Sequence, residues 1–123
     1  MSGFKELKVW QISIDLVMHV YKATADFPKD ETYGLVSQMR RCAVSIPSNI
    51  AEGSSRNGAK EFTHFLYIAH GSLSELDTQL IISKQLGYIN DTVIFENMMK
   101  QLRSMIAGLI SSQQTKTNPT NKI

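Results

Sequence analysis

Apolar side chains recur at steps of three and four residues through four stretches of the chain, which is the spacing of amphipathic helices. The four predicted helices cover residues 6–26, 31–56, 59–86 and 92–112. No stretch alternates apolar and polar positions as a half-buried strand would. The pattern therefore predicts an all-α protein.

The first predicted helix carries more apolar residues than one packing face needs. Its two stripes are Leu7, Trp10, Ile14, Val17 and Tyr21, and Val9, Ile12, Leu16, Val20 and Phe27. One stripe is enough to enter a four-helix core. Two stripes indicate that this helix is covered on more than one side, either within the chain or by a second subunit. Pro28 biases Phe27 away from helical geometry, so the helix is expected to end there.

The second predicted helix contains a proline within its apolar pattern. The stripe consists of Leu35, Met39, Cys42, Ile46 and Ile50. Pro47 removes the hydrogen bond to the carbonyl four residues back, so the helix either stops near Ile46 or continues to Arg56 with a kink. The apolar spacing keeps its phase through Ile50 and Ala51, which favours the kinked helix.

The third and fourth helices have the most regular patterns. Their inward positions are Phe62, Leu66, Ala69, Leu73, Leu76 and Leu80, and Phe95, Met99, Leu102, Ile106 and Leu109. Because short turns join antiparallel neighbours, we expect an up-down-up-down four-helix bundle with the second helix kinked at Pro47. The bundle is predicted to span residues 1–113, and the polar, aperiodic residues 114–123 to form a disordered tail.

Residues suited to helix ends stand at the predicted boundaries. Asp30 or Thr32 is expected to cap the second helix, and Asn90 or Asp91 the fourth. Gly87 stands where a C-terminal glycine would end the third helix.

The length of 123 residues fits one domain, and the net charge of +2 does not by itself indicate a nucleic-acid binder. Cys42 is the only cysteine, so no internal disulfide can form, and its place on an apolar stripe predicts a buried, inert thiol. No apolar run resembles a signal peptide or reaches the roughly 20 residues that cross a bilayer. We therefore expect a cytoplasmic protein without a membrane partner.

Catalytic motifs are not recognisable in the sequence. Glu61 and His64 have the E-x-x-H spacing of di-iron carboxylate bundles, but such a site needs a second pair, and Asp15 with His19 is a poor substitute. Gly53 lies in no phosphate-binding loop, because the lysine and hydroxyl residue that complete such a loop do not follow. We expect no metal, cofactor or small-molecule substrate, and no enzymatic activity.

A polar stripe runs beside the apolar stripe of the second helix. Its members are Gln38, Arg41, Ser45, Asn49, Glu52 and Arg56. The stripe is either a solvated face or a polar interface or internal network, and the sequence leaves both alternatives open. The residues that could meet nucleic-acid phosphates are Arg40, Arg41, Arg56, Lys60 and Lys84.

The string RRCAVSIPSNIAEGSSR, from Arg40 to Arg56, resembles a signature of the small four-helix-bundle proteins encoded in intervening sequences of bacterial 23S ribosomal RNA genes. The segments FKELKVWQ, FPKDETYGL, EFTHFLYIAHGSLSELDTQL and LGYI resemble the same family in the same order, so the likeness extends to about Ile110. It implies a bacterial cytoplasmic protein that assembles as a ring-shaped homopentamer. The family has no established biochemical activity.

A related branch, the accessory proteins of diversity-generating retroelements, is basic, binds nucleic acid and partners a reverse transcriptase. The present chain departs from that branch in its low net charge. The sequence and the resemblance together predict a non-enzymatic homo-oligomeric scaffold or interaction protein whose partner is itself. The alternative is a nucleic-acid-binding accessory factor that acts on RNA or DNA.

Overall fold

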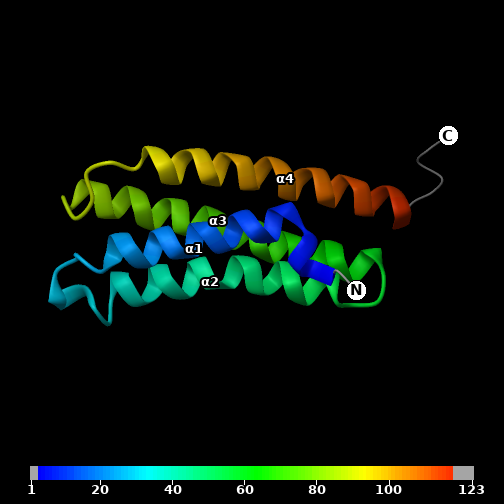
Figure 1. Ribbon diagram of the computed structural model, residues 1–123, viewed down its shortest axis with the longest axis horizontal. Coiled ribbons are helices and arrows are strands. Elements are labelled where there is room, and N and C mark those ends of the chain that lie inside the picture. The colour runs from blue at the N-terminus through cyan, green and yellow to red at the C-terminus, as the bar shows by residue number, and fades with distance from the viewer. Residues whose placement is uncertain (1–2, 118–123) are drawn as a thin grey trace.

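The computed structural model describes residues 3–117, which form four long helices and two short 3₁₀ turns without any strand. The helices are α1 (Lys8–Thr24), α2 (Leu35–Ser54), α3 (Ala59–Gln85) and α4 (Val93–Thr117), and the turns are Gly3–Glu6 and Lys29–Glu31. Figure 1 shows the four helices lying side by side, with successive helices running in opposite directions. The prediction of an all-α four-helix protein is confirmed.

Each helix packs against the next one in the chain, and α4 closes the bundle against α1. The α2–α3 contact is the most extensive. Within residues 3–117, no Cα atom of α1 lies within 8 Å of one of α3, and the same holds for α2 and α4, so these two pairs lie diagonally across the core. The α1–α2 pair and the α3–α4 pair therefore form opposite sides of the bundle, and the α2–α3 pair forms a side of its own.

The buried core follows the predicted stripes of α2, α3 and α4. For α1 the structure decides between the two stripes: Val9, Leu16 and Val20 are buried in the core, whereas Trp10 and Val17 are only half buried. The stripe that begins at Val9 thus supplies the contribution of α1 to the core. The stripe that contains Trp10 and Val17 remains partly open to solvent along α1, where another surface can cover it.

The second helix continues through Pro47, which is buried, and ends at Ser54. The alternative that it stops near Ile46 is wrong, while the kink stays a prediction. The helix begins at Leu35 rather than near residue 31, because the Glu31 side chain accepts a hydrogen bond from the Leu35 amide at 3.2 Å.

The capping of α2 by Asp30 or Thr32 is also wrong, since the residue before the helix is Gly34 and residues 29–31 form a 3₁₀ turn of their own. Glu31 holds a second partner here, because its other carboxylate oxygen accepts a hydrogen bond from the Tyr88 hydroxyl at 3.0 Å. A contact between residues so far apart along the chain joins the turn before α2 to the turn after α3.

The C-terminal end of α3 agrees with the prediction that Gly87 ends this helix. Gly87 has a φ of +79°, its amide donates to the Lys84 carbonyl at 3.0 Å, and the Tyr88 amide donates to the Ser83 carbonyl at 2.9 Å. These two bonds make a Schellman motif, which requires the left-handed backbone that glycine adopts without strain. The predicted cap of α4 is off by one residue, because the helix begins at Val93 and the residue before it is Thr92. The Asp91 carboxylate still accepts a hydrogen bond from the Val93 amide at 3.0 Å.

The last helix is longer than the sequence pattern predicts. It reaches Thr117, so residues 114–117, assigned to a disordered tail, are helical. Gln113 is buried against the bundle, which explains why the helix continues past the last apolar position of its stripe. Residues 118–123 of the predicted tail lie outside the described residues. In the part of the chain that the structure describes, no helix is long and apolar enough to cross a membrane.

At Gly53, α2 lies close against α3. A Cβ atom at this position would lie 2.7 Å from the Cβ of Phe65 and 3.0 Å from Cδ1 of Phe62. Such distances are shorter than van der Waals contact, so the spacing of the two helices at this point requires a residue without a side chain.

Candidate functional site: a polar groove between α2 and α3

The polar stripe of α2 borders a groove on the α2–α3 side of the bundle. The groove has a volume of about 470 Å³. Its lining includes Gln38, Arg41, Cys42 and Ser45 from α2, Ser72 and Glu75 from α3, and Ser37 and Tyr33 at one end. This size is within the usual range of small-molecule pockets.

Hydroxyl and thiol groups join the two helices at the floor of the groove. The Ser45 and Ser72 hydroxyl oxygens lie 2.7 Å apart, and Ser45 also donates to the Cys42 carbonyl at 2.6 Å. The Cys42 thiol donates to the Ser72 carbonyl at 3.0 Å. These bonds fix the register of α2 against α3 and leave hydroxyl oxygens as acceptors on the floor.

The register places two opposite charges across from one another. Arg41 precedes Ser45 by one helical turn, and Glu75 follows Ser72 by one turn. Because α2 and α3 run in opposite directions, both side chains lie on the same side of the serine contact. A guanidinium and a carboxylate therefore flank the groove from its two walls.

Burial of Cys42 and, to a lesser extent, the nearby Glu75 carboxylate together raise the pKa of its thiol from 9.0 to about 12. The predicted burial of this thiol is confirmed, since its exposed fraction is 5%. A neutral thiol at physiological pH is a poor nucleophile, so Cys42 acts as the hydrogen-bond donor to the Ser72 carbonyl and not as a reactive group.

We expect the Cys42 thiol to react with a dithiodipyridine reagent roughly a thousandfold more slowly in the folded protein than in urea at about pH 8, from the difference in thiolate fraction. The pKa of the Cys42 thiol is higher in the folded chain than in the unfolded chain, so the neutral thiol favours the folded state. This contribution to the free energy of unfolding is complete below pH 9.0 and is lost as the pH rises towards about 12. Equal reaction rates in the folded and unfolded protein would contradict the burial of the thiol.

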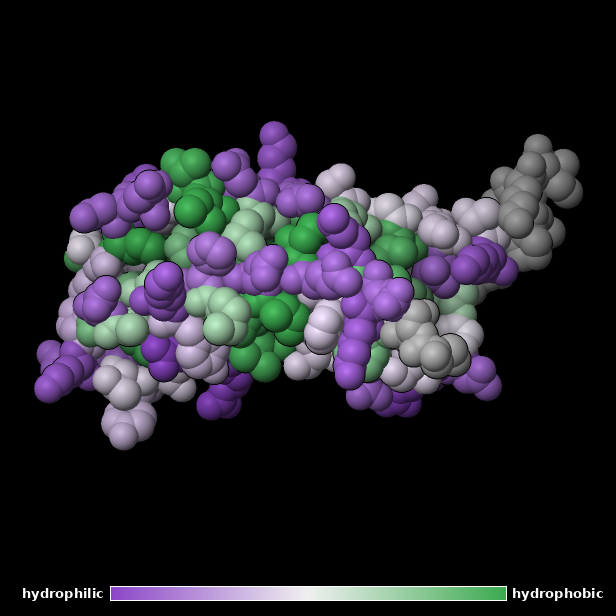
Figure 2. Space-filling model, viewed as in Figure 1, coloured by the Kyte–Doolittle hydropathy of each residue, from purple (hydrophilic) through white to green (hydrophobic). Residues whose placement is uncertain are grey.

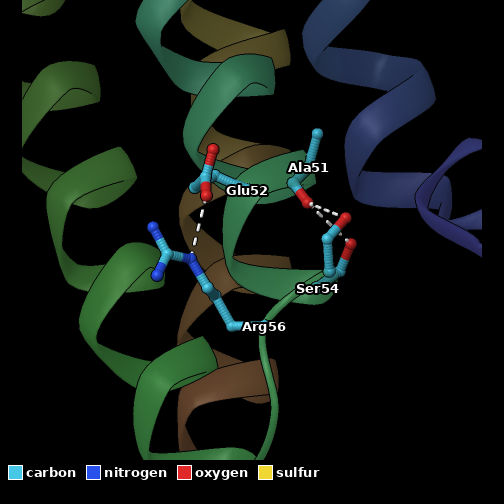
Figure 3. Close-up of polar contacts among 5 residues, drawn as sticks. Ala51, Glu52, Ser54 and Arg56 are labelled. Atoms are coloured by element: carbon cyan, nitrogen blue, oxygen red, sulfur yellow. Dashed lines mark hydrogen bonds and ion pairs between the residues drawn. The ribbon is translucent and has the colours of Figure 1, made fainter.

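The rest of the polar stripe divides into different environments. The Asn49 amide donates to the Ser45 carbonyl at 2.7 Å and is half buried. Figure 3 shows Glu52 and Arg56 turned towards one another at the end of α2, and their side chains form an exposed ion pair of 2.9 Å. The stripe is therefore a solvated face at one end and an internal network in its middle.

The five candidate phosphate-binding cations are not gathered in one place. Arg40 donates to the Thr24 hydroxyl at 2.9 Å and to the Tyr21 carbonyl at 3.3 Å, so its guanidinium holds the end of α1 against α2. Lys60 and Lys84 stand near opposite ends of α3, roughly 36 Å apart at the helical rise per residue. Of the other two, Arg41 lines the groove and Arg56 forms the ion pair with Glu52 described above.

A model of the family of 23S rRNA-intervening sequence proteins matches residues 5–111, which include most of all four helices and the whole groove. The chain belongs to this family. A comparison with curated proteins found no match.

For this member of the intervening-sequence family, the remaining sequence candidates form no recognisable site. Glu61 and His64 are both exposed on α3, and the His64 ring packs against Phe65 with 5.2 Å between the ring centres. Among residues 3–117, no three histidine, cysteine, aspartate or glutamate side chains are grouped so that they could hold a metal ion.

The sequence pattern did not indicate the α3 wall of the groove. Ser72 and Glu75 flank the apolar stripe of α3 and resemble an ordinary solvated edge when that helix is considered alone. Their spacing of three residues places them on one face, but only the pairing with Ser45 shows that this face meets the polar stripe of α2.

Proposed function

We propose that this intervening-sequence protein is a non-enzymatic cytoplasmic module that assembles with copies of itself, head to tail, into a closed ring. The observation that supports the proposal most strongly is the presence of two separate exposed apolar surfaces on opposite sides of the bundle. The resemblance implies five copies, and five chains of 13.8 kDa would have a mass of about 69 kDa.

The first surface is a shallow groove between α1 and α2, which we call the α1–α2 groove. It is lined by Trp10, Ile14, Val17, Val44, Pro47, Ser48 and Ala51. It contains the half-buried stripe of α1 that packs against the edge of the core and stays partly open to solvent, and Val44 on its α2 wall is 39% exposed. The lining is almost entirely apolar, so water is displaced from it at a gain in free energy when another apolar surface covers it.

The second surface surrounds the turn between α3 and α4, and we call it the α3–α4 tip. It consists of Ile81, Ile82, Leu86, Val93 and Ile94, whose exposed fractions range from 43% to 57%. Figure 2 shows hydrophobic surface over the beginning of α4 and over the middle of α2, among the surrounding hydrophilic residues. Clustered apolar side chains of this kind are typical of protein–protein contact surfaces.

The position of the two surfaces supports one kind of symmetry over another. In a twofold dimer the same patch meets itself, so each chain would leave its second apolar surface in water. When the α3–α4 tip of one copy packs into the α1–α2 groove of the next, both surfaces are covered in every copy. Such a heterologous contact gives a ring when its rotation closes.

The test is light scattering coupled to size-exclusion chromatography at micromolar concentration. We expect the wild-type chain to elute at a multiple of 13.8 kDa. Val44→Glu in the α1–α2 groove and Ile94→Glu in the α3–α4 tip should each give a monomer, because a buried unpaired carboxylate is costly. Ser104→Glu, at an exposed position on α4, is the matched control and should leave the assembly intact.

Mixing the two monomeric variants distinguishes the head-to-tail contact from a twofold one. Each variant keeps the surface that the other has lost, so the mixture should form a one-to-one heterodimer of about 28 kDa, twice the chain mass, and grow no further. A monomeric wild type would overturn the proposal of self-assembly. A mixture that stays monomeric would overturn the head-to-tail geometry.

The alternative function, nucleic-acid binding with RNA or DNA as the partner, has weaker support. A ring would repeat each exposed cation around an axis and so multiply the low charge of one chain. However, Arg40 and Arg56 already have partners within the chain, and Lys60 is far from Lys84. We therefore give preference to the self-assembling module.

A further inference from the structure

The polar groove between α2 and α3 belongs to neither of the two apolar surfaces. It lies on the side of the bundle formed by α2 and α3, whereas the proposed contacts use the α1–α2 groove and the α3–α4 tip. Its chemistry also differs, because its walls carry charges and its floor carries hydroxyl groups. The proposed contacts between copies therefore do not use this groove.

The two charges of the groove are separated by the space between the helices. Arg41 and Glu75 form no ion pair with one another, and within residues 3–117 the only ion pairs are Arg56–Glu52 and Arg103–Asp77. Glu75 has one weak partner, the Gln79 amide at 3.5 Å. A guanidinium donor and a carboxylate acceptor thus face the same cavity with most of their bonding capacity unused.

The floor and the open end of the groove add neutral groups to these charges. Ser45 and Ser72 place hydroxyl oxygens on the floor of the groove, one helical turn along from Arg41 and Glu75. Tyr33 lies at the open end with 95% of its surface exposed, so its ring is free to cover a bound molecule. An aromatic ring at the edge of the groove can add a cation–π contact to a bound ammonium group.

We propose that the α2–α3 groove binds a small zwitterion of the α-amino acid class, with Arg41 holding the carboxylate of the ligand and Glu75 its ammonium group. A ligand with both charges a few ångströms apart can satisfy both walls at once, which neither a simple anion nor a simple cation can do. Arginine suits the planar carboxylate because it offers two parallel N–H donors. No bond is made or broken, so the site is one of recognition.

The volume of about 470 Å³ accommodates an amino acid together with its side chain. Both charges are exposed, so the binding is expected to be weak, with a dissociation constant of about 1 mM. The identity of the side chain is decided at the end of the groove beyond the charged pair, where Gln38 and Tyr33 lie.

The experiment is isothermal titration of the full chain with each of the twenty standard L-amino acids in turn. Acetate and methylamine serve as half-ligands that carry one charge each. We expect at least one amino acid to bind saturably and both half-ligands to bind at least about tenfold more weakly, which corresponds to 1.4 kcal/mol. Arg41→Gln and Glu75→Gln should each reduce the affinity for that amino acid by a similar factor.

Two matched variants act as controls. Lys100→Gln removes an exposed cation on α4, and Glu61→Gln removes an exposed carboxylate on α3, and both should leave the affinity unchanged. Circular dichroism and light scattering on the same samples show that the groove variants keep the fold and the assembly state. The proposal is overturned if no amino acid binds saturably, if acetate binds as tightly as the amino acid, or if binding survives both groove variants.

This result is independent of the self-assembly test. If the chain is monomeric and still binds an amino acid through Arg41 and Glu75, the self-assembly proposal is contradicted and the ligand-site proposal is supported. If the chain forms a ring and its Arg41 and Glu75 variants bind the amino acid as tightly as the wild type, the self-assembly proposal is supported and the ligand-site proposal is contradicted.

Discussion

Replacing Gly53 by alanine should lower the free energy of unfolding by about 1–3 kcal/mol, the usual range for forcing an extra methyl group into a packed contact. The added Cβ would lie 2.7 Å from the Cβ of Phe65. That atom is fixed to the backbone of α3 and cannot rotate away, so the two helices must move apart. Since the α2–α3 contact is the most extensive in the bundle, the loss of packing spreads along both helices.

The matched control is Gly71→Ala, at an exposed position within α3 where an added Cβ meets nothing within 4 Å. Alanine forms helix more readily than glycine, so this change should raise the free energy of unfolding by about 0.4–1 kcal/mol. Urea unfolding followed by circular dichroism measures both variants. Stabilisation by Gly53→Ala would show that the helices are not in close contact there.

Leu73→Ala should have the larger effect, a loss of about 2–5 kcal/mol, which is the range found for leucine truncation in packed cores. Leu73 is fully buried near the middle of α3, on the stripe that faces the other helices. Truncation removes apolar surface from the core and leaves a cavity that four long helices cannot close without shifting.

Ile68→Ala serves as the comparison for Leu73, because Ile68 is an apolar residue of the same helix with 40% of its surface exposed. Its truncation leaves no cavity, and we expect a loss of at most about 1 kcal/mol. Denaturant titrations should be made on both variants in the monomeric Ile94→Glu background, so that assembly does not contribute. Similar losses for the two variants would contradict the assigned core face of α3.

The regular elements were predictable from the sequence because their causes are local. Six apolar positions at alternating steps define α3, and Gly87 marks its end by a left-handed backbone that follows from residue type. The start of α2 was not predictable. Glu31 takes part in a turn that depends on Tyr88, so the preference of Asp30 and Thr32 for capping is overridden by a contact distant in sequence.

The candidate site was predictable only on one side. The periodicity of α2 correctly placed Arg41 and Ser45 on one face, but the facing residues Ser72 and Glu75 depend on the register between two helices. That register is set by packing at Gly53 and by the hydroxyl contact, neither of which has a signature within a single helix. In the same way, the pattern could not show that Arg40 is engaged by the end of α1.

An even number of alternating helices has a practical consequence. The beginning of α1 and the end of α4 lie at one end of the bundle, and the α3–α4 tip lies at the other (Figure 1). A fluorescent protein or affinity handle fused at either terminus would project from the same pole, clear of the tip. Labelled and unlabelled chains can therefore be mixed to count subunits without the label itself blocking that surface.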